Sequence, residues 1–161
     1  MDHKTYHIGL WRYARDFFWA AERLRRYDST ENVTIYLYCH SMELSLKALL
    51  IYHGSTEKEL RTIGHDLIDA WDRSTRTGLN QHLADFRGVK AVIELINPYY
   101  QGKEFEYLVP GIKQFPSLAD IHNASEDLLQ SVGKTIDIPI TQLSRQLQPI
   151  DETTASALIT N

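Results

Sequence analysis

The chain has 161 residues, of which 43% are hydrophobic and 24% are charged, and its formal net charge is −4. A chain of this length can form one domain with a substantial buried core. The negative charge argues against broad, nonspecific affinity for nucleic acid and gives RNA binding little support. No apolar run approaches the roughly 20 residues of a membrane-spanning helix, and the first residues lack the apolar stretch of a signal peptide. We therefore expect a cytoplasmic protein without membrane contact.

The spacing of apolar residues predicts helices from the N-terminus onward. Leu10, Ala14, Phe17, Ala21 and Leu24 recur at intervals of four and three, which places them on one face of a helix over about residues 6–27. A second, almost wholly apolar helix is expected over about residues 31–53. A glycine follows it directly, as is common where a helix ends in a left-handed conformation.

Capping signals mark the next two elements. Thr56 and Glu59 match a capping box and start a short helical turn. Gly64 ends that turn, and His65 or Asp66 opens a third helix that runs toward Arg76.

The second half of the chain predicts two further helices, joined by a segment without the helical spacing of apolar residues. The fourth helix is expected over about residues 80–97, stopped by Pro98. Apolar and polar residues then alternate, and a Pro-Gly turn dipeptide follows, so a small β-hairpin or an extended loop is expected near residues 103–115. Ser117 begins a capping box that opens the last helix, which runs to about Val132.

These elements predict an all-α fold, an antiparallel bundle of four to five helices. Residues 1–135 form a single domain in this interpretation. Residues 136–161 contain two prolines and no sustained apolar period, so we expect a C-terminal tail that is flexible or docked on a partner.

Four polar residues share one narrow stripe of the second helix: Tyr36, His40, Glu43 and Lys47. At about 100° per residue they fall within roughly 60° of one another. Apolar residues flank the stripe on both sides. An ordinary surface helix has one polar arc opposite its apolar arc, whereas this pattern predicts a polar seam on a mostly buried helix.

The stripe has three interpretations, which the sequence leaves open. Glu43 and Lys47 have the favourable i, i+4 order and can form an internal ion pair that fixes the packing of the helix. If that pair is covered, loss of one partner would cost about 3–5 kcal/mol. The stripe can also line a groove for a ligand or a partner, or carry a catalytic His–Glu pair. His65 and Asp66 are the second candidate, either as local capping groups or in proton transfer.

The candidate polar groove thus comprises Tyr36, His40, Glu43, Lys47, His65 and Asp66. The chain has no HExxH motif, paired Cys-x-x-Cys, phosphate-binding glycine loop or nucleophile elbow. The sequence therefore predicts no metal and no cofactor. Its single cysteine, Cys39, cannot form an internal disulfide and is expected to be a small core side chain.

Two of these motifs together resemble the HEPN superfamily, the higher eukaryotes and prokaryotes nucleotide-binding domain. They are the run MELSLKALLIYHG, which holds Glu43, Lys47 and Ala48, and the run LRTIGHDLIDAW, which holds Gly64 and His65. The resemblance covers roughly residues 10–132. It implies a small helical bundle that dimerises and that often occurs beside nucleotidyltransferases or in toxin–antitoxin and phage-defence systems.

Some members of that superfamily are metal-independent ribonucleases in which four to six residues lie between an Arg and a following His. Here only Arg76 and His82 have that spacing, with Thr77 after the Arg and the helix breaker Gly78 between them. The resemblance therefore implies a noncatalytic interaction module, either a homodimer or the partner of a nucleotidyltransferase or an antitoxin. A ribonuclease toxin that uses Arg76 and His82 is the alternative. A nucleotide- or small-ligand-binding bundle is the second alternative.

Overall fold

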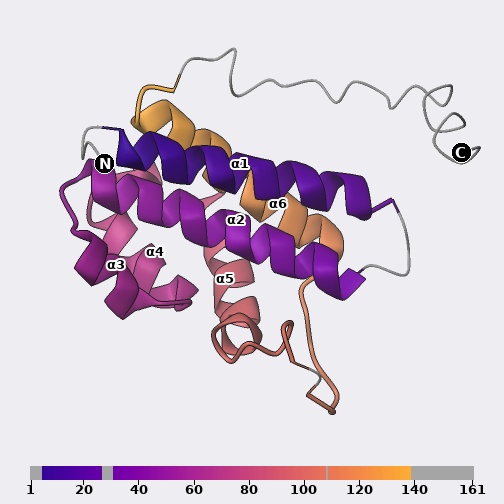
Figure 1. The fold of residues 1–161 in the computed structure, drawn as a ribbon. Coiled ribbons are helices and arrows are strands. Elements are labelled where there is room, and N and C mark those ends of the chain that lie inside the picture. Colours follow the sequence, from indigo (N-terminus) through magenta and orange to yellow (C-terminus); the bar gives the residue numbers. More distant parts are fainter. Residues whose placement is uncertain (1–4, 27–30, 108, 139–161) are drawn as a thin grey trace, which may run out of the picture.

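The computed structural model describes residues 5–26, 31–107 and 109–138. Within these ranges every regular element is helical and no strand is present, so the all-α prediction is confirmed. In chain order the elements are α1 (Tyr6–Leu24), α2 (Glu31–Tyr52), α3 (Glu57–Ile63), α4 (Leu67–Thr75), the 3₁₀ turn η2 (Leu79–Gln81), α5 (Phe86–Gln101) and α6 (Leu118–Thr135) (Figure 1). None of these helices is long and apolar enough to cross a bilayer.

Helix α2 is the central element of the described chain. It packs against α1, α4, α5 and α6, and Figure 1 shows α1 and α2 side by side with α6 behind them. One shoulder of its polar stripe is fully buried, from Ile35 through Cys39 and Met42 to Leu46. Ser41 and Ser45 on its back are also fully buried. Their small side chains allow the neighbouring helices to approach closely.

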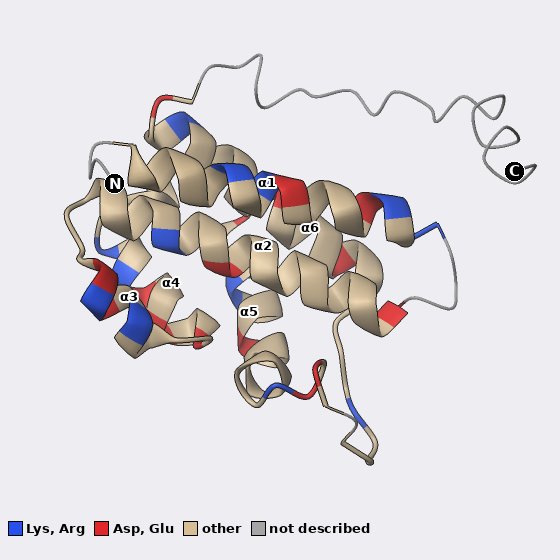
Figure 2. Ribbon diagram, in the orientation of Figure 1, with Lys and Arg blue, Asp and Glu red and all other residues tan. Residues whose placement is uncertain are grey.

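Helix α1 covers α2 with its apolar face and presents Arg12 and Arg23 to solvent. Trp11, Ala14 and Phe18 are buried, and the indole Nε1 of Trp11 donates a hydrogen bond to the carbonyl oxygen of Leu129 in α6 at 2.9 Å. Figure 2 shows the basic residues of α1 along its exposed side. The predicted end of this helix at Tyr27 lies outside the described residues.

The capping signals predicted for α3 and α4 are confirmed. Thr56 accepts a hydrogen bond from the Glu59 amide, and the Glu59 carboxylate accepts one from the Thr56 amide. Asp66 is the N-cap of α4 and accepts from the amides of Ile68 and Asp69, both at 3.0 Å. These bonds satisfy amides that a helix start leaves without intrahelical partners.

Both predicted ends of the fourth helix are wrong. Residues 79–81 form the 3₁₀ turn, and α5 begins only at Phe86, after the N-cap Asp85. The helix starts late because the Asp127 carboxylate of α6 accepts from the amides of Ala84 and Asp85, at 3.0 and 2.9 Å, and holds them outside the helix. At the other end Pro98 lies inside α5, which continues to Gln101. Pro98 has no amide to donate to the carbonyl oxygen of Glu94, yet α5 continues for three residues beyond it.

The hairpin expected near residues 103–115 is absent from the described part of that segment. Residues 103–107 form turns, and residues 109–116 run without regular structure. The segment is held by contacts other than strand pairing. Phe115 packs on the ring of Tyr99 at a centroid distance of 4.8 Å, the Gln114 amide donates to the Tyr99 hydroxyl at 3.1 Å, and Lys113 pairs with Glu104 at 2.9 Å. Of the alternating apolar residues, Phe105 packs on Phe115 at a centroid distance of 5.5 Å, whereas Tyr107 and Val109 are exposed.

Helix α6 completes the core by packing against α1, α2 and α5. Ser117 caps it, as predicted, by accepting from the Asp120 amide at 3.1 Å. The helix ends at Thr135, and Ile136 and Ile138 just beyond it are buried, at 3% and 6% exposed. These two residues of the expected tail therefore belong to the core, whereas the rest of the tail, residues 139–161, lies outside the described residues.

Candidate functional site

Glu43 lies at the centre of the candidate polar groove, with only 3% of its surface exposed. The ammonium group of Lys47 donates a hydrogen bond to Oε1 of Glu43 at 2.6 Å. Oε2 accepts from the Tyr100 hydroxyl at 2.5 Å and lies 2.9 Å from Nδ1 of His65. Three elements, α2, α5 and the turn before α4, therefore meet at one carboxylate.

His40 joins this network through Tyr100. Its Nδ1 lies 2.9 Å from the Tyr100 hydroxyl oxygen and 3.7 Å from Oε2 of Glu43. The hydroxyl has one proton, which it donates to Glu43, so Nδ1 of His40 must be the donor to the Tyr100 oxygen. His65 must likewise donate from Nδ1, because an ionised carboxylate only accepts hydrogen bonds. The contacts thus assign the proton-bearing nitrogen of both imidazoles.

Aromatic rings hold the His40 imidazole in place. Tyr36 stacks on it with an interplanar angle of 6° and a centroid distance of 5.9 Å. Phe17 of α1 meets it edge-on at 4.4 Å. The ring of Tyr100 lies 6.0 Å from that of Tyr36. Together these rings leave the imidazole partly exposed, with 20% of its side chain accessible.

The environment of Glu43 favours its charged form. Burial opposes ionisation of the carboxyl, but His40, Lys47 and Tyr100 outweigh burial and hold the pKa of Glu43 well below its usual range. Burial, and then the adjacent Glu43 charge, raise the pKa of the Tyr100 hydroxyl far above its ordinary value. Around neutral pH the pair is therefore a carboxylate with a protonated phenol as donor.

Lys47 also connects α2 to the loop that ends α3. Besides its bond to Glu43, its ammonium group donates to the carbonyl oxygen of Gly64 at 2.7 Å. Gly64 has a φ of +59°, in the region that glycine adopts most readily. The glycine thus turns the chain so that its carbonyl oxygen faces Lys47 and the next residue, His65, faces Glu43. This single turn therefore brings both the Gly64 carbonyl oxygen and the His65 imidazole to the Glu43–Lys47 pair.

Asp66 belongs to a different set of hydrogen bonds from that of Glu43. Besides capping α4, its carboxylate accepts from the side-chain amides of Asn97 at 3.3 Å and Gln101 at 3.0 Å. Asn97 in turn accepts from the amide of Leu67 at 2.7 Å. Asp66 therefore joins α4 to α5, while the other five predicted residues, Tyr36, His40, Glu43, Lys47 and His65, line one continuous network.

Sequence reasoning missed Tyr100 as a member of the site. A usable signal was present, because Ile93, Ile96 and Tyr100 follow one another at helical intervals and all three are buried. The predicted stop at Pro98 hid it, since Tyr100 then lay outside any helix. A hydroxyl on the buried face of α5 needs a partner, and α2 supplies Glu43.

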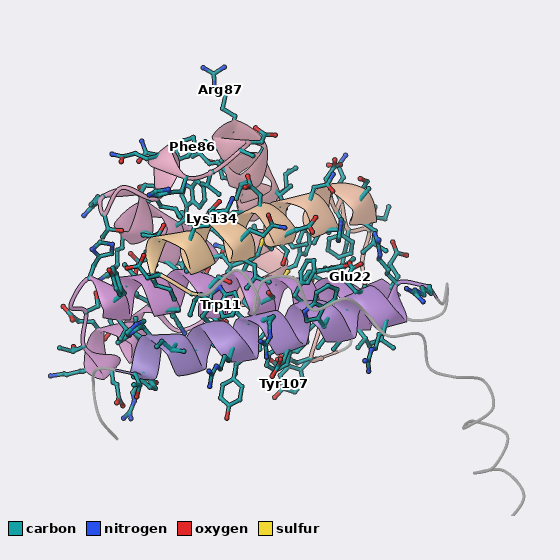
Figure 3. All side chains as sticks on the ribbon, turned by 90° about the horizontal axis from the view of Figure 1, so that it is seen from above. Trp11, Glu22, Phe86, Arg87, Tyr107 and Lys134 are labelled. Carbon is teal, nitrogen blue, oxygen red and sulfur yellow. The ribbon has the colours of Figure 1, made fainter. Side chains whose placement is uncertain are left out.

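A second buried carboxylate, Glu22 of α1, was also missed. The hydroxyl of Tyr38 donates to Oε1 of Glu22, Nδ1 of His122 lies 2.7 Å from the same oxygen, and Arg25 pairs with Oε2 at 3.2 Å. Figure 3 labels Glu22 on α1. Burial and Glu22 raise the pKa of the Tyr38 hydroxyl. Glu22, Tyr38 and His122 come from three helices, α1, α2 and α6, so helical spacing alone could not find this network.

Arg76 and His82 lie on different elements. Arg76 is the C-cap of α4, and His82 follows the 3₁₀ turn η2. Between them Gly78 has a φ of +93°, which breaks the helical path. Both residues are exposed, and within the described residues no hydrogen bond or ion pair joins them.

A cleft of about 310 Å³ opens beside the polar groove. It lies between the first turns of α1, the second half of α2, and α3. Lys47, His65 and Arg61 line it together with one carboxylate, Glu57. Two cations, Lys47 and Arg61, thus face one carboxylate in its wall. In the part of the chain that the structure describes, no group of three or more His, Cys, Asp or Glu side chains is arranged to hold a metal ion.

Comparisons with protein-family models, with curated proteins and with solved structures found no match to this chain. The role of the protein must therefore be inferred from the geometry of its side chains. The motif resemblance that includes Glu43, Lys47 and His65 adds to that inference without testing it.

Proposed function

We propose that this chain is a noncatalytic, HEPN-like interaction module, an antiparallel helical bundle that acts as a homodimer or as the partner of another protein. A nucleotidyltransferase or an antitoxin is the kind of partner that the motif resemblance implies. The observation that carries the proposal is the complete engagement of Glu43. Both of its oxygens accept short bonds from Lys47, Tyr100 and His65.

A general base needs a free lone pair directed at a substrate and a pKa near the working pH. Glu43 is unsuited to this role, since only 3% of its surface is exposed to a substrate and its pKa is lowered. Tyr100 is equally unsuited to acid–base work, because its pKa is raised far from neutrality. The network therefore supports a structural role, in which polar side chains fix the relative position of α2, α4 and α5.

The placement of Arg76 and His82 gives the ribonuclease alternative no comparable support. The paired residues of HEPN ribonucleases normally lie within one helix, whereas here a left-handed glycine separates the two. We expect the purified chain to leave RNA intact. Expression of the wild type and of His82→Ala in bacteria checks this, with growth and RNA integrity as readouts. Growth arrest that His82→Ala relieves would establish the ribonuclease reading instead.

The interaction proposal is tested by the mass of the chain in solution. Size-exclusion chromatography with light scattering at micromolar concentration should give twice the mass of the chain, or the mass of a heterocomplex when the partner is co-expressed. A monomer that also fails to bind a co-expressed neighbouring gene product would contradict the proposal.

A second candidate, binding of a small anion, is favoured by the cleft of about 310 Å³ that Lys47, Arg61 and His65 line. Thermal-shift measurements with nucleotides address it. Arg61→Gln is the suitable variant because 83% of that side chain is exposed, so the fold should not depend on it. Arg73→Gln, on α4 and outside the cleft lining, is the control. A shift that Arg61→Gln abolishes and Arg73→Gln preserves would support the cleft as a site.

A further inference from the structure

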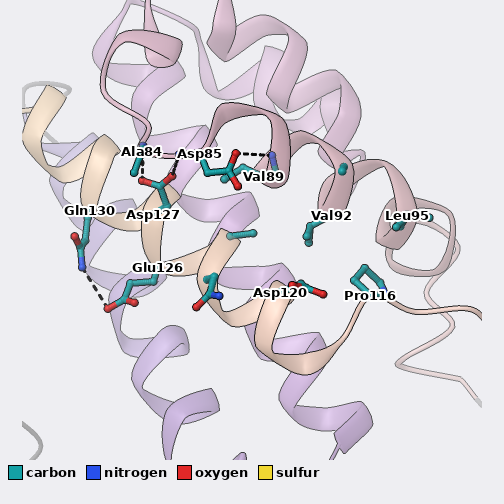
Figure 4. Close-up of a pocket in the computed structure, with 14 residues that line it drawn as sticks. Ala84, Asp85, Val89, Val92, Leu95, Pro116, Asp120, Glu126, Asp127 and Gln130 are labelled. Carbon is teal, nitrogen blue, oxygen red and sulfur yellow. Dashed lines mark hydrogen bonds between the residues drawn. The ribbon is translucent and has the colours of Figure 1, made fainter.

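A groove of about 650 Å³ runs between α5 and α6, on a part of the surface away from the Glu43 network (Figure 4). Its floor is apolar, formed by Val89 and Val92 of α5 and Ala124 of α6. At one end Leu95 is 54% exposed, an unusual state for a leucine beside other apolar side chains. From Phe86 to Leu95 the α5 wall rises about 14 Å, at about 1.5 Å per residue. The groove is long enough for about two and a half turns of another helix.

The rim of this groove is acidic. Asp85, Asp120, Glu126 and Asp127 line it, and none of its lining residues is Lys or Arg. Glu126 has a His122 nitrogen 3.5 Å away, whereas the other three carboxylates form no ion pair with described residues. Arg87, the arginine at the start of α5, projects away from the body of the molecule in Figure 3. Asp85 and Asp127 also accept hydrogen bonds from backbone amides at the start of α5, but no Lys or Arg of the described residues pairs with the rim, which therefore presents net negative charge around an apolar floor.

From this juxtaposition we infer that the α5–α6 groove docks a cationic amphipathic segment of a partner protein, with apolar side chains on the floor and Lys or Arg on the rim. This inference rests on the proposed function as an interaction module and names the chemistry of its partner. Apolar burial would supply most of the affinity. The carboxylates would select positive partners and speed their association.

The chain's own C-terminal residues do not match this groove. Residues 139–161 contain a single cation, Arg145, together with Asp151 and Glu152. A second copy of the chain could offer the arginines of α1. That occupant is an outcome that the experiment distinguishes.

The experiment measures binding of a fluorescein-labelled synthetic peptide of about two to three helical turns, with leucines on one face and lysines beside them. Fluorescence anisotropy should show saturable binding to the full chain that weakens as salt is raised. Two control peptides separate the contributions: one replaces each lysine by glutamate, and the other replaces each leucine by serine. Neither should bind measurably.

Variants of the chain test whether the peptide binds in the groove. Leu95→Lys should weaken binding about tenfold, because it removes apolar contact and adds repulsion. Asp120→Asn combined with Glu126→Gln should weaken it about threefold to fivefold, as expected for two exposed charge pairs. The matched control, Asp16→Asn with Glu31→Gln, removes two exposed carboxylates outside the groove and should change nothing. Circular dichroism melts confirm that each variant is folded.

Equal binding of the glutamate peptide, or unchanged affinity in the Leu95→Lys protein, would overturn the inference. The inference would also be overturned if no peptide bound and Leu95→Lys lowered the mass in light scattering from that of a dimer to that of a monomer. The occupant of the groove would then be a second copy of the chain. If the chain remains a dimer and the lysine peptide does not bind, the inferred partner chemistry is refuted while the proposed function as an interaction module is not. RNA degradation that depends on His82 refutes the proposed function itself.

Discussion

Glu43 shows how a single buried charge is made tolerable. Its carboxylate is almost fully removed from water, yet three donors on three parts of the chain replace the lost hydration. Lys47 is the only one of these donors that always carries a full positive charge at neutral pH, and it has 13% of its side chain exposed. Removing one member of such a group leaves another without a partner, and that loss is the main energetic consequence.

We predict that Glu43→Gln lowers the free energy of unfolding by about 3 kcal/mol near pH 7, because Lys47 then keeps a largely buried charge without a counterion. Urea denaturation measures the change. Glu57→Gln is the control, since Glu57 is half-exposed and lies 3.6 Å from an arginine on the surface. A change below about 0.5 kcal/mol in Glu43→Gln, equal to that of the control, would contradict the structural role of the network.

Glu43→Gln should also change how the free energy of unfolding depends on pH. Because the pKa of Glu43 is lowered in the folded chain, its stabilising contribution is present above the unfolded value of about 4.3 and is lost as pH falls below it. The wild type should therefore lose stability between about pH 5 and pH 3 more steeply than Glu43→Gln does. Urea midpoints measured across that range would show parallel curves if Glu43 made no such contribution.

At the scale of single elements, caps decide where the helices begin. Asp66 ends the turn after α3, caps α4, and receives the side-chain amides of Asn97 and Gln101 from α5. Asp127 acts on α5 in a comparable way from α6. The start of one helix thus depends on a residue of another, which a local sequence pattern cannot reveal.

We predict that Asp66→Ala lowers the free energy of unfolding by about 1–2 kcal/mol and speeds hydrogen exchange at the amides of Ile68 and Asp69, which lose their acceptor. Ser117→Ala, which removes the cap of α6, is the matched control. It should cost about 1 kcal/mol and leave exchange in α4 unchanged. Unaltered exchange at Ile68 in Asp66→Ala would show that the cap does not hold this turn.

At the scale of the whole molecule, α2 passes through a core to which α1, α4, α5 and α6 all contribute. The hydrogen bond from Trp11 to Leu129 joins the first and last helices across 118 positions of sequence. Trp11 is fully buried, so its indole contributes both volume and a specific donor. The described part of the chain is therefore expected to unfold as one unit.

We predict that Trp11→Phe lowers the free energy of unfolding by about 2–3 kcal/mol, because it leaves a cavity and removes the hydrogen bond from the indole to α6. Helical circular dichroism and tryptophan fluorescence should still report a single coincident transition. Trp71→Phe, which removes the same volume where Trp71 packs on Phe86, is the control for the cavity. Two separate transitions in Trp11→Phe would show that α1 is a distinct folding unit.

The helical class, the course of α2 and the capping residues Thr56, Asp66 and Ser117 can be read from the sequence, because these depend on spacing and chemistry within a few neighbouring residues. Four members of the Glu43 network share one helical stripe, so spacing alone groups them. By contrast, the contacts of Tyr100 with Glu43, of His122 with Glu22 and of Asp127 with the start of α5 become evident only when the helices are packed together. Each of these contacts joins helices far apart in the chain, and packing of the whole core determines which side chains meet.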